Sequence, residues 1–307
     1  MNGASRFISI CLWAGLAVAV GGCTTTAPGG GRIAADNHAS RVAQIIRVAG
    51  ATRRGGDLRS AAILYGRAHD MAPEQAAPLA ALGEIAGVLG QYPEASRAYA
   101  KAVELDPENA GMRRAYAMVL IAAGHPRRAA EQLKAALTLD DADHRSHNGL
   151  GIALDLLGEH QTAQGHYRNG IAIAPSRRAL RNNLALSLAI GGNYVEALRI
   201  LQGIAAGPAA DARSRQNLAL VHGLAGNDEK AAEIGRIDLS RADVENNLAY
   251  YRALRKLSPP ERAAAVLGLR VKRTPGPVAR SNAKRLPLLA DLPQTPYNFP
   301  STKGYWA

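Results

Sequence analysis

Apolar residues recur at helical spacing along the middle of the chain. The stretch 76–109 shows the pattern most fully, with apolar side chains three or four positions apart at Leu79, Leu82, Ile85 and Leu89. Gly90 follows, and glycine ends helices readily because it adopts positive φ without strain. Pro93 suits the first turn of a second helix, and Pro107 closes that helix. The pattern predicts two amphipathic helices with a tight turn between them.

The same unit repeats with a constant period along the chain. The glycine between the two helices recurs at Gly56, Gly90, Gly124, Gly158, Gly192 and Gly226. Small residues keep the same period in the first helix (Ala49, Gly83, Ala117, Gly151, Ala185, Ala219) and in the second (Ala61, Ala95, Ala129, Ala163, Ala197, Ala231). They are expected where helices cross closely, because a large side chain would push the backbones apart. This period is that of the tetratricopeptide repeat, so the sequence predicts an all-α fold, a right-handed α-α superhelix of about six repeats.

The end of the repeat array departs from this period. The tripeptide Asn-Leu-Ala at 217–219 recurs at 247–249, earlier than the period would place it. The missing stretch amounts to about one helical turn, so we expect a shortened second helix in the sixth unit and a further helix over 242–257. Ser258 and Glu261 have the spacing of a capping box and predict the start of a last helix. We expect that helix to cover the exposed end of the stack.

Residues 1–22 have the pattern of a signal peptide. One basic residue, Arg6, precedes an apolar run over 7–20, which is too short to span a bilayer comfortably. The run ends in Val-Gly-Gly-Cys at 20–23, which resembles a bacterial lipobox. The resemblance implies cleavage before Cys23 and lipidation of its thiol, and two or three acyl chains hold a protein firmly to a membrane. The alternative is a secretory leader with an incidental cysteine.

The residues after Cys23 extend this interpretation. No aspartate follows the cysteine, so we expect sorting to the outer membrane of a Gram-negative bacterium, with the protein facing the periplasm. Residues 23–41 are rich in Thr, Ala, Pro and Gly and predict a flexible tether ahead of a solenoid over 42–268. Removal of the leader leaves Cys23 as the one cysteine, which excludes disulfides, zinc clusters and thiol catalysis.

Residues 269–307 differ in composition from the repeats. They hold seven basic residues against one acid, Asp291, and so carry +6 of the net charge of +12. Six prolines interrupt any helix, which predicts a basic, proline-rich tail without regular structure. The tail ends in an aromatic-rich segment, YNFPSTKGYWA. It is either a solvated tail or a segment that becomes ordered on a partner or an acidic surface.

The sequence contains no pattern of an enzyme. It has no phosphate-binding glycine loop, no Gly-x-Ser-x-Gly and no His-Glu-x-x-His, so we expect no catalysis, no cofactor and no small-molecule substrate. Basic residues are not interleaved with aromatic ones in the repeats, which argues against nucleic acid. His144 and His147 lie three apart, with His160 and His166 nearby, but no carboxylate or thiol is placed with them. We therefore expect a solvated helix face and no metal site.

Polar residues repeat on the first helix of several units, which lines the inner groove of such a superhelix. They are Asn148, Asn182, Asn183, Gln216, Asn217, Asn246 and Asn247. An asparagine side chain donates and accepts together, so a ladder of them could pair with the backbone of an extended peptide. Arg145 and Arg213 lie one turn earlier and could hold a carboxylate. The alternative is that the asparagines tie neighbouring helices together or lie in solvent.

The second half of the chain resembles a known family. The segments SRQNLALVHGLAGNDEKAAEIGRIDL at 214–239 and VENNLAYYRAL at 244–254 are similar to the C-terminal part of the TadD-like tetratricopeptide lipoproteins of the tight-adherence (Flp) pilus assembly system. The resemblance implies a non-enzymatic outer-membrane lipoprotein that helps localise or assemble a secretin pore. Its partner would be that secretin or another pilus-assembly component. Alternatives are a pilotin or scaffold for another type IV pilus or secretion system, and an accessory subunit of a cell-envelope polysaccharide enzyme.

Overall fold

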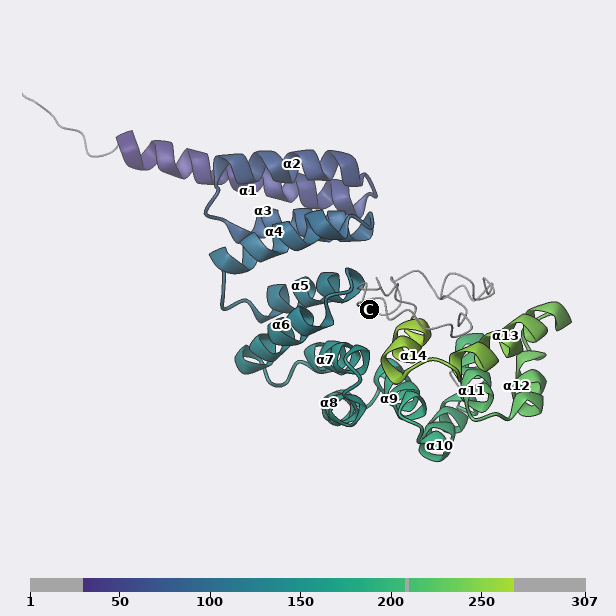
Figure 1. Ribbon diagram of the computed structural model, residues 1–307. Helices are drawn as coiled ribbons and strands as arrows, with labels where there is room; N and C mark the ends of the chain where they lie inside the picture. The colour runs from purple at the N-terminus through teal and green to yellow at the C-terminus, as the bar shows by residue number, and fades with distance from the viewer. Residues whose placement is uncertain (1–29, 208–209, 268–307) are drawn as a thin grey trace, which may run out of the picture.

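The computed structural model describes residues 30–207 and 210–267, with side chains from residue 37 onward (Figure 1). This part of the chain consists of helices joined by short turns and contains no strand. The helices are α1 (Gly30–Arg54), α2 (Leu58–Met71), α3 (Ala76–Val88), α4 (Tyr92–Leu105), α5 (Ala110–Ala122), α6 (Pro126–Leu139), α7 (His144–Leu156), α8 (His160–Ile173), α9 (Arg178–Ile190), α10 (Tyr194–Ala205), α11 (Ala212–Leu224), α12 (Asp228–Gly235), α13 (Arg241–Leu254) and α14 (Pro259–Val266).

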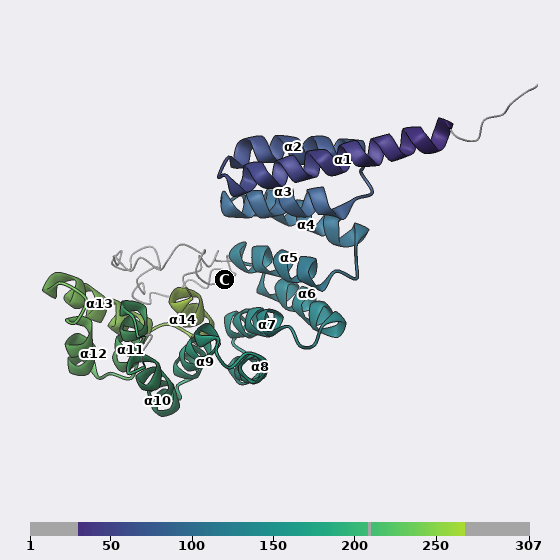
Figure 2. The same cartoon turned by 180° about the vertical axis from the view of Figure 1, so that it is seen from behind.

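The helices up to α13 stack in sequence order into a curved solenoid, as the sequence predicts. Each of them packs on the next one along the chain, and the first helices of neighbouring units also contact one another, α5 on α7 and α7 on α9. Figures 1 and 2 show α6, α8, α10 and α12 on the outside of the curve, with α7, α9 and α11 on the inside. The first helices of the units therefore line the inner side of the curve, which we call the inner wall.

The turn inside each unit depends on its glycine. All six predicted glycines have positive φ, between 74° at Gly90 and 91° at Gly56. In this left-handed region a side chain is strained, so the regular recurrence of glycine fixes the place of every tight turn.

The small residue of the first helix is set by a close helix crossing. A Cβ atom added to Gly83 would lie 2.6 Å from Cδ2 of Tyr99. A Cβ atom added to Gly151 would likewise lie 2.6 Å from Cε1 of Tyr167. Tyr99 and Tyr167 are buried in the core, so neither ring can move into solvent. Two helices of one unit thus approach closely because a flat ring lies over a residue without a side chain.

The C-terminal helices confirm part of the prediction and correct part of it. Helix α12 is short, α13 continues the stack against α11 and α12, and α14 begins at a capping box formed by Ser258 and Glu261. However, α14 does not cover the end of the stack: it turns back and packs against α7 and α9, inside the curve (Figures 1 and 2). The reason is its apolar surface, because Ala263 and Val266 join the main core.

The predicted tether also differs from the structure. Of residues 23–41, those from Gly30 onward form the first turns of α1, a helix of 25 residues that extends beyond its partner α2 (Figure 1). The earlier part of the tether, Cys23, the leader over 1–22 and the tail over 269–307 lie outside the described residues.

The crossing at Gly83 can be tested by substitution. Gly83→Ala should destabilise the protein by about 1–3 kcal/mol, because the added methyl group overlaps the ring of Tyr99. Adding Tyr99→Leu should make the combined loss smaller than the sum of the two single losses, since it recreates the Ala117 and Leu133 pair of the next unit. Urea unfolding followed by circular dichroism measures both effects.

Gly66→Ala is the matched control, because a Cβ at this helical glycine meets no atom within 4 Å. It should be neutral or stabilising by roughly 0.5–1 kcal/mol. Strict additivity of Gly83→Ala and Tyr99→Leu would contradict the crossing.

Candidate peptide-binding groove

The inner wall divides into two halves that differ in chemistry. Toward the N-terminal ends of α7, α9 and α11 it carries Arg145, Asn148, Asn182 and Arg213, which we call the polar half. The two arginines are exposed and the two asparagines are half-buried. Toward the C-terminal ends of α7 and α9 the wall is apolar and lies under α14. The polar half is therefore the part of the wall that carries exposed charged side chains.

Asparagine side chains join neighbouring units across this wall. Asn183 donates from Nδ2 to Oδ1 of Asn148 over 2.8 Å, and Asn217 donates likewise to Asn182 over 2.7 Å. The donors are buried, since Asn183 is 2% exposed and Asn217 is 6% exposed. Each bond links first helices of successive units, so these side chains tie the helices of the stack together.

Asn148 and Asn182 use only their oxygen atoms in these bonds. Among the described residues, no acceptor is hydrogen-bonded to Nδ2 of either side chain. The two amide donors therefore remain available to a carbonyl oxygen of a bound peptide.

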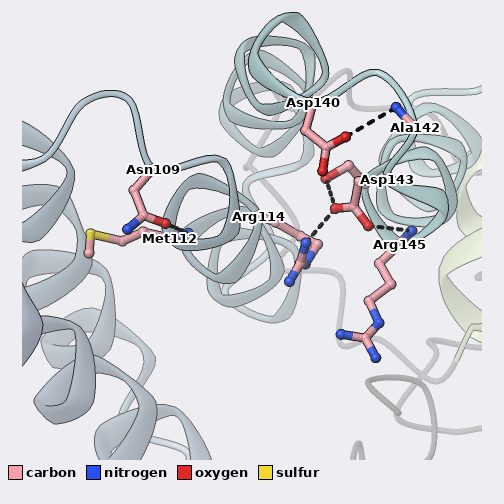
Figure 3. Close-up of polar contacts among 8 residues, drawn as sticks. Asn109, Met112, Arg114, Asp140, Ala142, Asp143 and Arg145 are labelled. Atoms are coloured by element: carbon pink, nitrogen blue, oxygen red, sulfur yellow. Dashed lines mark hydrogen bonds and ion pairs between the residues drawn. The ribbon is translucent and has the colours of Figure 1, made fainter.

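Ion pairs hold the N-terminal ends of the inner helices in register. Asp143 caps α7 by accepting from the backbone N–H of Arg145 over 3.0 Å, and its other oxygen accepts from Arg114 of the preceding unit (Figure 3). Burial raises the pKa of Asp143, but hydrogen bonds from Ser146 and Arg114 outweigh it and leave the pKa below its ordinary value. Arg178 pairs with Asp211, the cap of α11, over 2.8 Å in the same way.

The arginines that the sequence predicts for the inner wall, Arg145 and Arg213, take no part in these ion pairs. The side chain of Arg145 extends away from Asp143 in Figure 3, and no ion pair or hydrogen bond to its guanidinium involves a described residue. The same holds for the guanidinium of Arg213 within the described part of the chain. Both guanidinium groups are exposed, and the charge of Arg213 helps to lower the pKa of Asp211.

The remaining predicted positions are on α11 and α13. Gln216 is buried next to Asp238, whose pKa is lowered mainly by the hydrogen bond from Arg215. Asn247 is buried in α13, and no described residue bonds to its Oδ1. Asn246 on the same helix is exposed.

Comparison with known proteins supports the fold. A family model described as a tetratricopeptide repeat matches residues 89–151. The fold is the tetratricopeptide-repeat superhelix. The structure of PilF from Pseudomonas aeruginosa is similar with a TM-score of 0.55 and 20% identity, over 66% of this chain and 91% of that chain.

Two further solved structures resemble this superhelix. PilW, described as a widely conserved type IV pilus biogenesis factor, has a TM-score of 0.57 and 18% identity over 63% of this chain and 90% of its own. A tetratricopeptide repeat protein from Parabacteroides merdae has a TM-score of 0.54 and 16% identity over 67% of this chain and 82% of its own. No protein of curated function matches the sequence. At these identities the likeness concerns the fold alone.

The histidines do not form the solvated face that the sequence predicts. His147 is 8% exposed, and its Nδ1 lies 3.1 Å from Nδ1 of His166 on α8. Burial and the neighbouring His147 lower the pKa of His166. The reason is that α8 packs along this face of α7. Within the described residues no three histidine, cysteine or acidic side chains gather where they could hold a metal ion.

A buried polar cluster in the superhelix escapes the sequence analysis. Asp155 is 1% exposed and accepts hydrogen bonds from Ser187 over 2.7 Å, from Tyr167 over 3.0 Å and from a ring nitrogen of His160 over 2.8 Å. Burial raises the pKa of Asp155 against the effect of these partners. The cluster joins the fourth and fifth units. Its one sequence signal is an aspartate in an otherwise apolar run of α7.

The buried amide ladder predicts unequal effects of two asparagine substitutions. Asn183→Ala should destabilise the protein by about 1–3 kcal/mol, because it removes the bond to Asn148 between two units. Asn246→Ala, at an exposed position of α13, should change stability by less than about 0.5 kcal/mol. Thermal unfolding followed by circular dichroism measures the difference, and equal effects would contradict a structural role for the ladder.

Proposed function

We propose that the protein is a non-enzymatic adaptor lipoprotein of the outer membrane, which holds a segment of a secretin or another pilus-assembly component during Flp pilus assembly. The observation that carries the proposal is the open polar half of the groove. There, two guanidinium groups and two amide donors lie on neighbouring inner helices without a hydrogen-bond partner among the described residues. The resemblance at 214–254 to the TadD-like lipoproteins supports the choice of system.

The arrangement suits an extended peptide with an acidic group. Nδ2 of Asn148 and of Asn182 would donate to backbone carbonyls, and Arg145 and Arg213 would bind carboxylates. A rigid wall also limits the cost of binding, because the asparagine side chains are already held by the interunit bonds. The description of PilW as a type IV pilus biogenesis factor fits such a role.

Membrane attachment would come from Cys23. No helix in the part of the chain that the structure describes has the length and apolar character needed to cross a bilayer. A lipidated Cys23 would place the superhelix at the periplasmic face of the outer membrane, next to a secretin.

The anchor is tested by Cys23→Ser in the producing bacterium. The substitution should move the protein from the outer-membrane fraction to the soluble periplasmic fraction, because the acyl chains are then missing. Immunoblotting of separated fractions measures the shift. A protein that stays in the outer-membrane fraction would place the anchor elsewhere.

The groove is tested by replacing Arg145 and Arg213 together with alanine. Crosslinking in intact cells followed by mass spectrometry should then yield at least about tenfold less crosslinked secretin or pilus component than the unsubstituted protein does. The reason is that each charge-assisted hydrogen bond contributes roughly 1.5–3 kcal/mol to binding. The melting temperature should stay unchanged, since both side chains are exposed.

Arg127 and Arg199 supply the matched control, because they are exposed on the outer helices α6 and α10. Their double replacement should leave the crosslinks intact. Equal losses in the two double variants would argue against the groove. Recovery of a glycosyltransferase in place of a secretin would favour the role of an enzyme-accessory subunit.

A further inference from the structure

The first helices of four successive units each end in an apolar residue. These residues are Val88 on α3, Ala122 on α5, Leu156 on α7 and Ile190 on α9. They lie one repeat period apart and so form a row along the inner wall, which we call the apolar row. At the α9 end the row is buried beside α14, since Ile190 is 1% exposed and its carbonyl oxygen accepts a bond from Arg262. Leu156 and Ala122 are half-buried, and Val88 is 56% exposed. The described residues therefore leave the α3 end of the row uncovered.

The neighbours of Val88 on α3 show that its side chain points to the inside of the curve. Gly83 faces the ring of Tyr99 on the outer helix α4. Val88 follows five residues later and lies about 140° further around the helix axis, on the side away from α4. Glu84, one turn before Val88, forms an ion pair with Arg53 of α1, the first helix of the preceding unit. Val88 is thus an exposed apolar side chain on the inner wall.

Small side chains line the inner wall around Val88. Ala80, Ala81 and Gly87 on α3 are half-buried, and so is Ala115 on α5. They leave room beside Val88 for bulky groups, and an aromatic side chain buries about 150–250 Å² when it packs on such a surface. The wall of the second and third units is therefore suited to aromatic rings.

Helix α14 fixes the point from which the rest of the chain continues. Ala263 and Val266 belong to the main core, so the end of α14 is held inside the curve against α7 and α9. Residues 268–307 lie outside the described residues and continue from this point, with about 30 residues between Leu267 and Tyr297. A coil of that length spans on the order of 30 Å. Two steps between packed first helices lead from α7 to α3, at about 8–10 Å each. The apolar row is therefore within reach of Tyr297 and the residues after it.

The segment 297–306 has a composition that matches the apolar row. It reads YNFPSTKGYW and contains four aromatic residues and one charged residue, Lys303. The row lies at the C-terminal ends of the first helices, where the helix dipole favours Lys303 and the basic residues that precede the segment. The N-terminal ends of α7 and α11 instead carry Arg145 and Arg213, which repel them. Charge thus directs the segment to the ends of the helices where the row lies.

From these observations we infer that residues 297–306 dock on the apolar row of their own chain, with aromatic rings over Val88 and Ala122. The polar half, at the opposite ends of the first helices, is not part of this contact. Both surfaces belong to one chain, so the segment binds at a high effective concentration, on the order of millimolar. While docked, it shields the row from other apolar surfaces. The inference goes beyond the proposed function and does not depend on it.

Trp306 reports the docking directly. The chain holds one other tryptophan, Trp13, so the emission of the full chain in detergent minus that of the Trp306→Phe variant isolates the signal of Trp306. Acrylamide should quench this signal at least about fivefold less than that of a free peptide of residues 297–306 in the same detergent, because a docked ring is shielded from water. Quenching as strong as that of the peptide would overturn the inference.

Val88→Asp should raise the quenching of Trp306 to that of the free peptide, because it places a charge in the apolar row. The melting temperature should change little, since Val88 is more than half exposed. Val195→Asp is the matched control, because it makes the same change at a position of the outer helix α10 that is 84% exposed. It should leave the quenching unchanged. If Trp306 stays protected in Val88→Asp, the detergent or another surface shields the ring and the inference fails.

Photocrosslinking locates the contact without any change in the wall. A photoreactive phenylalanine derivative in place of Trp306 should, after illumination and mass spectrometry, be joined to residues of α3 or α5 of the same molecule. The yield should stay constant on about a hundredfold dilution, because the docking is intramolecular. Crosslinks to the outer helices would contradict the inference. Crosslinks between two copies that disappear on dilution would assign the row to a second molecule and overturn it as well.

Discussion

The structure depends on the close approach of two helices within each unit. At Gly83 and Gly151 the absence of a side chain lets a buried tyrosine ring lie directly on the helix backbone. This contact fixes the angle and spacing of the pair, and the positive-φ glycine fixes the turn between its helices. Since a turn glycine and a small residue at the crossing recur in every unit, the curvature of the stack and the position of the inner wall follow from them.

The repeat also explains how much the sequence can predict. Glycines and small residues recur at a fixed spacing, so the fold and its turns could be predicted from them. The sixth unit departs from this spacing, which predicts the short α12 and the further helix α13. The place of α14 could not, because Ala263 to Val266 form an apolar surface that fits an end of the stack as well as its inner wall. Pairing between segments far apart in the chain leaves no periodic trace in one sequence.

The same limit applies to the groove. The register of Asn148, Asn182, Asn183 and Asn217 predicts that they share the inner wall, but not which atoms bond. The buried cluster around Asp155 is harder still to predict from the sequence, since its partners Tyr167 and Ser187 come from two different helices. Local spacing identifies residues on one helix face, whereas contacts between units depend on the curvature of the finished stack.

The two interpretations of the asparagine ladder, as a tie between helices and as a peptide site, are compatible. Asn148 and Asn182 accept interunit bonds through Oδ1, and Nδ2 bonds to no described acceptor. An amide carries a donor and an acceptor, so one side chain can hold the fold and bind a ligand at the same time. Leucine would serve neither purpose, and serine would lack the reach to do both. This double use of the amide is a physical reason for asparagine at these positions. The hydrogen bond accepted by Oδ1 fixes the side chain and thereby orients the Nδ2 donor.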